Sequence, residues 1–360
     1  MKFIQVFLFF LGVSFQVNAS ELGDLFDNYQ AALKGGNLSE VVASAETVYG
    51  FCESNLPDSS KSRAAATLNY GMALASFGKK SEAELYLRKA VKRYQSIYGE
   101  DALEVISPLM ELAKSLAEDF QRSSRPEYRR PLKKALKIAK LQKGEESAFY
   151  AILSFEAGQI AMDYARDTWA YRYLVAAQDA FSGPFKEHTY YGFLSDFYLG
   201  KYLMLKGKYK EAEPYLLNAL ELADIEENRD EQLELVARAF LVEIFEKTGQ
   251  VERSIEQCRR IGQATPFDMD QEPQPLFSPG LKYPKAALRT NMEGHVVASF
   301  TISDTGIPID IEILETKGTK EFGRAAEEYL AGSRFAPRFI EGTPVETPDR
   351  RIRFNFNIAK

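Results

Sequence analysis

The sequence is poor in the residues that most often carry out chemistry. Its 360 residues include two histidines, two cysteines and one tryptophan. It has no HExxH motif, no Gly-x-Ser-x-Gly elbow, no glycine-rich phosphate loop and no closely spaced pair of cysteines. Those patterns mark zinc proteases, serine hydrolases, nucleotide-binding proteins and structural zinc sites. The sequence therefore predicts no enzyme, no catalytic residue, no metal site and no cofactor.

An excess of positive charge is also missing. The chain carries 45 Lys and Arg residues against 51 Asp and Glu residues, which gives a net charge of −6 and a pI near 5.4. Proteins that bind nucleic acid usually need a basic footprint that faces the phosphates. The composition therefore argues against a nucleic-acid partner.

Long apolar runs are scarce, and the one that stands out opens the chain. Lys2 precedes an apolar run from Phe3 to Val17, and Ala19 places a small residue where a signal peptidase cleaves. The run is shorter than the roughly 20 apolar residues of a membrane-spanning helix. We expect residues 1–19 to be a secretory signal peptide that is cleaved on export. The alternative is an uncleaved segment that anchors the chain in a membrane.

Residues 20–262 carry a repeat. Small and apolar residues recur with one spacing, as in Gly71, Gly78, Ala83, Leu87 and Ala90. Successive units start 42 residues apart, except for one step of 45, at Tyr29, Gly71, Ala113, Gly158, Gly200 and Val242. Stacked helix hairpins share a core in this way. The pattern resembles tetratricopeptide (TPR) repeats, with helices longer than in the common 34-residue form, and predicts an all-α solenoid of six units.

Arrays of this kind usually bind other proteins along a concave face. One residue past the repeated small position, the chain places Lys114, Gln159 and Lys201, and this position tends to face the groove in the TPR family. We expect these three residues to contact a partner. Met72 and Glu243 occupy the same position in other units, and the mixture of charges predicts no single ligand.

The two cysteines fall in the first and sixth units of this repeat, at Cys52 and Cys258. A disulfide needs two Cα atoms within about 7 Å of each other. The ends of a solenoid do not approach that closely, so we expect two buried thiols.

A proline-rich segment follows the repeats. Residues 263–279 contain Pro266, Pro273, Pro275 and Pro279 together with several acidic residues. Proline at this density favours an extended polyproline conformation. We expect a short linker that separates the solenoid from a second domain at residues 280–360.

The last 80 residues change to strand patterns. Every second residue is apolar from Val296 to Ile302 and from Ile309 to Ile313, with the turn residues Asp304-Thr305-Gly306 between the two runs. Thr319 reads as the N-cap of a helix, and a last alternating run ends the chain. The predicted fold is α+β and multidomain: an all-α TPR-like solenoid followed by a small β-β-α-β domain.

The order of these elements resembles the C-terminal domain of the TonB family. The matching residues are Tyr283-Pro284, Ala287, Gly294, Gly306, Ala325-Ala326, Phe335 with Pro337, Gly342 with Pro344-Val345, and Phe354. In that family the domain lies in the periplasm of Gram-negative bacteria and adds a peptide of an outer-membrane receptor to its sheet as a strand. The family also transmits energy from an inner-membrane proton channel through an N-terminal membrane helix that carries a histidine. No histidine precedes His188 here, which argues against direct use of the proton gradient by this chain alone.

The resemblance implies a set of partner-binding residues. The final strand is expected to be a sheet edge, whose unpaired backbone groups can accept another strand. Its polar face carries Arg351, Arg353, Asn355 and Asn357. These arginines either attract an acidic peptide or only guard the edge against self-pairing. The family match adds Tyr283 and Pro284 to the expected contact residues.

The sequence thus predicts a periplasmic adaptor without catalytic activity. Its expected partners are a TonB-dependent outer-membrane receptor at the C-terminal domain and a second envelope protein at the array, such as a membrane-anchored TonB or its proton-channel partners. A homodimer by strand exchange is possible. If the first segment is not cleaved, the chain is held at the inner membrane. The alternative function is an envelope-assembly scaffold or a peptidoglycan-associated binding protein that has no part in transport.

Overall fold

The structure is a computed structural model that describes residues 19–123, 126–163, 168–225, 230–265, 268–269 and 272–358. The predicted signal segment lies outside the described residues, except for Ala19. The chain divides into two compact units, Met1–Tyr173 and Leu174–Lys360. Across the residues that the structure describes, no helix is both long and apolar enough to cross a membrane.

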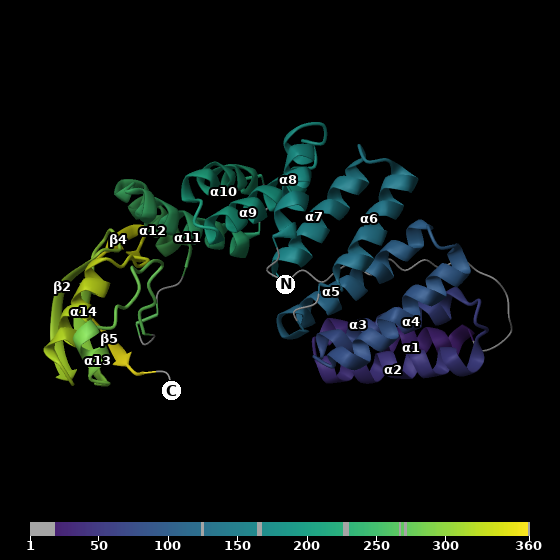
Figure 1. The fold of residues 1–360 in the computed structure, drawn as a ribbon, viewed down its shortest axis with the longest axis horizontal. Helices are drawn as coiled ribbons and strands as arrows, with labels where there is room; N and C mark the ends of the chain where they lie inside the picture. The colour runs from purple at the N-terminus through teal and green to yellow at the C-terminus, as the bar shows by residue number, and fades with distance from the viewer. Residues whose placement is uncertain are drawn as a thin grey trace. The chain divides into compact units, whose positions relative to one another are not determined.

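The first unit is helical (Figure 1). Consecutive helices pack against each other along the chain, as the repeat predicts. They are α1 (Ala19–Gly35), α2 (Leu38–Asn55), α3 (Lys61–Ser76), α4 (Lys80–Tyr98), the short 3₁₀ helix η1 (Leu103–Val105), α5 (Ile106–Ser123), α6 (Arg129–Lys143) and α7 (Ala148–Asp163), with the start of α8 (Trp169–Ser182).

The second unit continues the helical hairpins and then changes to a sheet. Its helices after α8 are α9 (Thr189–Leu205), α10 (Tyr209–Ala223), α11 (Glu231–Thr248) and α12 (Val251–Ala264). The remaining elements are α13 (Lys285–Arg289), β1 (Gly294–Ile302), β2 (Pro308–Lys317), α14 (Lys320–Ala331), β3 (Arg338–Ile340), β4 (Thr343–Val345) and β5 (Thr347–Phe356).

The repeated glycines allow the two helices of a hairpin to approach closely. A Cβ atom at Gly71 of α3 would lie 3.0 Å from Cγ of Leu87 in α4, and one at Gly200 of α9 would lie 2.6 Å from Cγ of Leu216 in α10. Leu87 and Leu216 are fully buried, and each is 16 residues after its glycine. The spacing seen in the sequence is therefore a packing contact between paired helices.

A second set of glycines closes the hairpins. Gly36, Gly78, Gly207 and Gly249 follow the first helix of their units and have φ angles between 72° and 84°. Glycine adopts this left-handed backbone without the steric cost that a Cβ atom brings. The 42-residue period thus places the same turn at the same point of four hairpins.

Both cysteines are buried and unbonded, as predicted. Cys52 lies in α2 and Cys258 in α12. Burial raises the pKa of Cys52 to about 11 and that of Cys258 to about 12. Both therefore remain neutral thiols at physiological pH and act as small packing residues.

The C-terminal module (residues 280–358) confirms the predicted strand-strand-helix-strand order. Its antiparallel sheet has the order β2-β1-β5, and α14 packs on β1 and β2. The turn between β1 and β2 uses Gly306 at a φ of 80°. The core draws on β1, β5, α13 and α14, together with Phe335: Ala287, Val296, Ala298, Phe300, Ile302, Phe322, Ala325, Ala326, Leu330, Phe335, Phe354 and Phe356.

The sequence missed a small hairpin in this module. β3 and β4 pair with each other between α14 and β5, in the register Arg338 to Val345 and Ile340 to Thr343. Each strand has three residues, too few for an alternating pattern to show, and Pro344 stands in one of them. The turn between them, Glu341-Gly342, has a positive φ at both residues.

The expectation of an unpacked linker over residues 263–279 is wrong for its second half. The amide of Leu276 donates to the carbonyl of Arg334 at 2.7 Å, and Phe277 forms an isolated antiparallel bridge with Arg334. Both side chains pack against a cluster of α11 and α12 residues that includes Val242 and Cys258. Apolar burial of these side chains opposes the extended preference of the prolines. The position of the domain boundary itself stays a prediction.

Candidate functional site

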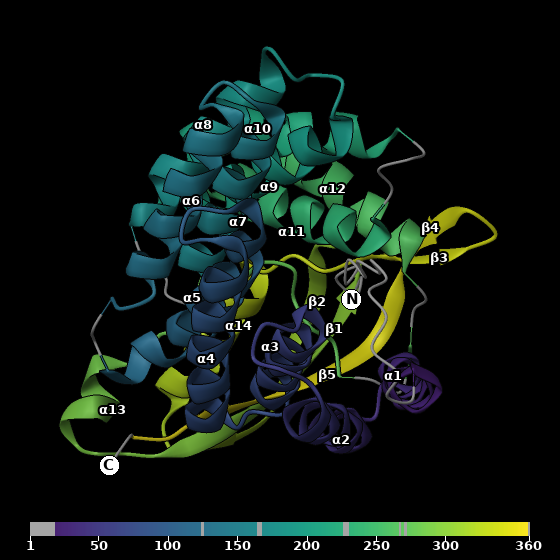
Figure 2. The ribbon, with the colours of Figure 1, turned by 90° about the vertical axis from the view of Figure 1, so that its right-hand side faces the viewer.

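The last strand of the module lies at the margin of its sheet. β5 pairs with β1 from Phe356 opposite Gly294 to Thr347 opposite Ile302, and the strand order places nothing on its other side among the described residues. Figure 2 shows β5 as the long yellow ribbon that ends the sheet. One side of its backbone therefore has N–H and C=O groups without a strand partner, which is what strand addition requires.

The two faces of β5 differ as the sequence predicts. Phe354 and Phe356 are buried against the module core. Arg351, Arg353 and Asn355 are exposed on the opposite face, and Asn357 beyond the strand is exposed as well. Arg353 Nε donates to Asn355 Oδ1 at 3.3 Å. A peptide at this edge would meet two cationic side chains on one face and the end of the phenylalanine core on the other.

The start of β5 is held differently. Arg350 is buried, and its Nη1 donates to the carbonyl oxygen of Met269 at 2.6 Å. This contact ties the beginning of the strand to the segment that follows α12. Sequence reasoning assigned no role to Arg350, because it reads as one more arginine beside Arg351 and Arg353. The exposed residues of the strand that were predicted to bind a peptide all follow Arg350, from Arg351 onward.

Tyr283 contacts its own module rather than an open surface. Its hydroxyl donates to the carbonyl of Met292 at 2.6 Å. Its ring packs edge-on against Phe322 and Phe356, at centroid distances of 5.6 and 5.7 Å. Pro284 comes next in the chain as the N-cap of α13. The Tyr283 ring thus packs against the end of β5 on the core face of the sheet. A direct partner contact by Tyr283 or Pro284 stays a prediction.

The module is fixed to the last helices of its own unit by polar contacts. Nε of Arg334, which precedes β3, donates to Glu246 of α11 at 2.8 Å, and both side chains are about nine-tenths buried. Arg259 of α12 lies 3.8 Å from the carboxylate of Asp304 in the β1–β2 turn. A buried ion pair restricts geometry because each charge loses its compensation when the other moves away.

Close backbone contacts surround that ion pair. A Cβ atom at Gly262 of α12 would lie 2.2 Å from the carbonyl oxygen of Pro337. A Cβ atom at Gly306 would lie 2.1 Å from the carbonyl oxygen of Phe335 and 3.4 Å from Cβ of Cys258. The module and α12 thus touch where neither has room for a side chain. Orientation of the β5 edge relative to α11 and α12 is set by these contacts.

The three array residues predicted to bind a partner are all half-buried on the first helix of their unit. They are Lys114 in α5, Gln159 in α7 and Lys201 in α9. Three residues before Lys114 and Gln159 stand Glu111 and Glu156, whose pKa values are raised by burial. The charge of Glu111 raises the pKa of Glu156 further, so α5 and α7 bring two carboxylates near each other. Lys201 Nζ lies 5.0 Å from the Tyr198 ring centroid.

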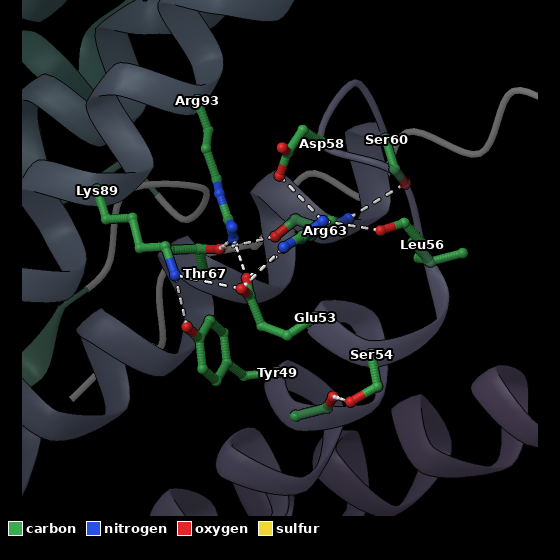
Figure 3. A network of polar contacts seen from close by, with 11 residues as sticks. Tyr49, Glu53, Ser54, Leu56, Asp58, Ser60, Arg63, Thr67, Lys89 and Arg93 are labelled. Carbon is green, nitrogen blue, oxygen red and sulfur yellow. Dashed lines mark hydrogen bonds and ion pairs between the residues drawn. The ribbon is translucent and has the colours of Figure 1, made fainter.

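Sequence reasoning missed a charged cluster at the first two hairpins. Glu53 of α2 forms ion pairs with Arg63 of α3 and with Lys89 and Arg93 of α4, at 3.0 Å to Arg63 and 3.3 Å to Lys89 (Figure 3). Burial by itself raises the pKa of Glu53, but hydrogen bonds from the three cations outweigh it and hold that pKa well below its usual range. The cluster joins neighbouring hairpins.

No group of three or more His, Cys, Asp or Glu residues has a metal-binding arrangement in the parts of the chain that the structure describes. His295, one of the two histidines, is half-buried on β1, and its Nε2 lies 2.9 Å from Glu315 Oε1 on β2. This is a cross-strand pair on the sheet face opposite α14.

Comparison with known proteins bears out both resemblances. Residues 279–358 match the Gram-negative bacterial TonB protein C-terminal domain, and residues 63–101 match a tetratricopeptide repeat. Protein TonB of Pseudomonas aeruginosa is 32% identical over 91 residues, which is 25% of this chain and 26% of that protein. The chain thus spans about a quarter of the length of this relative.

Among solved structures, the apo form of RapI has a TM-score of 0.48 at 13% identity, covering 68% of this chain and 74% of that one. The assembly chaperone of RpL4, Acl4, has a TM-score of 0.44 at 16% identity, covering 67% and 89%.

Proposed function

Because residues 279–358 form a TonB-type C-terminal domain behind a TPR-containing array, we propose that this chain is a protein-interaction adaptor of the bacterial envelope. In this proposal the β5 edge captures an extended peptide of an outer-membrane receptor, and the array recruits a second envelope protein. The observation that carries the proposal is the placement of β5, which has β1 as its one described strand neighbour and keeps a polar face exposed.

Binding would occur by strand addition. Backbone N–H and C=O groups of β5 would pair with the peptide and supply affinity that does not depend on sequence, while side chains at the edge select the partner. Arg351 and Arg353 are the exposed cations of this strand, so an acidic residue in the peptide would gain a charge-assisted hydrogen bond. A chain of this kind would act outside the cytoplasm, which agrees with the signal peptide expected at residues 1–19.

The array supplies the second half of the proposal. Lys114 and Gln159 lie on α5 and α7 beside Glu111 and Glu156, so this face offers both signs of charge. A membrane-anchored TonB or its proton-channel partners would be a suitable occupant, because no histidine precedes His188 to couple this chain itself to the proton gradient. The alternative is an envelope scaffold that binds peptidoglycan or a secreted protein without any part in transport.

Proline substitutions at the β5 edge test the capture mechanism. Asn355 and Ile352 are three residues apart, so their backbone N–H groups point to opposite sides of the strand. One of Asn355→Pro and Ile352→Pro therefore removes a group that faces the open edge, and Asn355→Ala and Ile352→Ala are the matched controls. We expect at least one proline variant to lose binding to immobilised N-terminal receptor peptides from the source bacterium, with the helical circular dichroism of the array retained.

Two outcomes separate the alternatives. If both proline variants bind the peptides as well as their alanine controls do, strand addition at β5 is wrong. If a deletion strain takes up receptor-dependent nutrients normally, the scaffold alternative is favoured over transport.

A further inference from the structure

One helix of the array carries a concentration of positive charge that the acidic chain shows nowhere else. α6, from Arg129 to Lys143, has seven cations and no acidic residue: Arg129, Arg130, Lys133, Lys134, Lys137, Lys140 and Lys143. The opposite side of α6 is apolar and buried through Pro131, Leu132, Ala135, Leu136, Ile138 and Ala139. Figure 1 shows α6 beside α5 and α7. The charge therefore gathers on one long face of a packed helix.

Five exposed cations, here called the α6 basic face, form this surface: Arg130, Lys133, Lys137, Lys140 and Lys143. The first four are spaced i, i+3, i+7 and i+10, which is one stripe along a helix. At a rise of about 1.5 Å per residue, the stripe from Arg130 to Lys143 is roughly 20 Å long. The result is a straight row of charges rather than a pocket.

Few of these charges are compensated within the described residues. Lys140 pairs with Glu145, and Lys134 beside the face lies 3.8 Å from Glu100. Lys133 and the neighbouring Arg129 pack over the Trp169 ring, at 4.6 and 4.5 Å from its centroid, and an aromatic ring leaves the charge of Lys133 in place. Arg130, Lys137 and Lys143 have no ion pair with any residue that the structure describes, so the row keeps most of its positive charge.

Helix stability does not account for this arrangement. Arg129 and Arg130 stand in the first turn, where the helix dipole favours anions, and Tyr128 supplies no side-chain cap. Like charges also meet at spacings of three and four residues, for example Arg130 with Lys133 and Lys133 with Lys137, and such pairs weaken a helix. Because these cations weaken the helix in two ways, we infer that they bind something outside the chain.

We propose that the α6 basic face docks on an anionic phospholipid surface. A protein partner would need a large apolar or aromatic centre in its contact area, since the cores of protein interfaces are depleted in charge. In the described part of α6 one large apolar side chain, Leu141, emerges near the lysines, and it is 64% exposed. A flat row of cations with one leucine suits headgroup phosphates at a membrane surface. This docking does not depend on peptide capture at β5.

Vesicle binding of the mature full-length chain tests the proposal. We expect co-sedimentation with phosphatidylglycerol-containing vesicles and little with pure phosphatidylcholine vesicles. Binding should decrease clearly as salt rises from about 50 to about 300 mM, because the Debye length falls from roughly 14 Å to roughly 6 Å. The triple variant Arg130→Glu, Lys137→Glu, Lys143→Glu changes the three cations that have no described ion pair. It should bind at least about tenfold more weakly, because each cation near an anionic surface adds to the attraction.

The fold of this variant can be checked independently. A glutamate at position 130 agrees with the helix dipole, and those at 130 and 137 stand four residues from Lys134 and Lys133. These gains oppose the unfavourable glutamate at position 143 in the last turn, so the melting temperature should change little. The matched control reverses three exposed cations of the C-terminal module, Lys282→Glu, Lys285→Glu and Arg289→Glu, and should bind vesicles like the wild type.

Equal vesicle binding by the α6 variant and the wild type would overturn the proposal, as would equal binding to neutral and anionic vesicles or none to either. If poly-glutamate competes for the α6 basic face at a lower charge concentration than the anionic vesicles, the occupant is an acidic polypeptide and the lipid assignment is wrong.

Discussion

Arg334 and Glu246 are 88 residues apart in the sequence, and they form a 2.8 Å ion pair that is almost closed to solvent. One residue comes from the C-terminal module and the other from α11, so the pair fixes the module on the last helices of the array in its unit. Phe277, from the preceding proline-rich segment, bridges to Arg334 from another side. The β5 edge is consequently carried on a packed interface, whereas the composition of this segment suggested a free tether.

Breaking this pair should loosen the module. Glu246→Gln leaves the Arg334 guanidinium buried without its counter-charge, and such a loss costs about 3 kcal/mol of unfolding free energy. Urea unfolding monitored by circular dichroism would measure it. The double variant Glu246→Gln, Arg334→Gln should recover part of the loss, because it removes the uncompensated charge. A Glu246→Gln variant as stable as the wild type would show that the ion pair does not hold the C-terminal module on α11.

The close contact at Gly262 gives a second test of the same interface. Alanine normally stabilises a helix by about 1 kcal/mol relative to glycine. At Gly262 the new Cβ would lie 2.2 Å from the Pro337 carbonyl oxygen, so Gly262→Ala should instead destabilise by about 1–3 kcal/mol. Gly50 of α2 is the matched control, since it has no atom within 4 Å of such a Cβ and Gly50→Ala should stabilise. Thermal melts of the two variants should shift in opposite directions.

Asp196 of α9 predicts an unusual pH dependence. It is 2% exposed, accepts from Asn218, and has one carboxylate oxygen without a described hydrogen bond. Burial raises its pKa from 3.8 to about 6, and hydrogen bonds from Asn218 and Gln178 only partly oppose this. A raised carboxyl pKa means that the folded state holds the proton more tightly, so stability decreases as the pH rises from about 4 to about 6.

Asp196→Asn should therefore stabilise the protein near neutral pH by about 2–3 kcal/mol, from roughly two pKa units at about 1.4 kcal/mol each. Below pH 4 the difference in unfolding free energy between the variant and the wild type should vanish, since the side chain at position 196 is then neutral in both proteins. Urea unfolding at pH 4 and pH 7 would measure it. A variant that is destabilised equally at both pH values would show that the carboxylate is needed for its hydrogen bonds.

Glu53 should make the stability of the protein depend on pH in the opposite direction to Asp196. Its pKa is held below the usual range by Arg93, Arg63 and Lys89, so its contribution to stability is present above the unfolded pKa and is lost as the pH falls through the folded one. Glu53→Gln should cost about 2 kcal/mol at pH 7, with allowance for its partial exposure, and progressively less in acid. Urea unfolding of the wild type and the variant at pH 7 and pH 3 would measure this. If the difference in unfolding free energy is the same at both pH values, the charge of Glu53 does not stabilise the fold.

Much of this architecture could be predicted from the residues because it follows from short-range rules. The Gly71–Leu87 contact and its counterpart Gly200–Leu216 are the repeat spacing itself, seen in three dimensions. The alternation of Phe354 and Phe356 with Arg353 and Asn355 also sets the two faces of β5 directly. Both features depend on neighbours along one helix hairpin or one strand.

The features that the sequence did not reveal depend on contacts between distant segments. Nothing near Glu246 marks it as the partner of Arg334, and the prolines around Leu276 and Phe277 conceal two packing residues. The Glu53 cluster takes its three cations from two other helices. Composition describes such segments by their average preference, while the fold is decided by the few side chains that become buried.

Amide hydrogen exchange with and without a receptor N-terminal peptide tests the β5 edge most directly. The sheet supplies its own control, because β2 is the other margin of the same three strands. We predict that peptide binding slows exchange at alternate amides between Arg351 and Asn357 and leaves those of β2 unchanged. Slowed exchange at β2 alone, or no change along β5 with the peptide bound, would contradict the account.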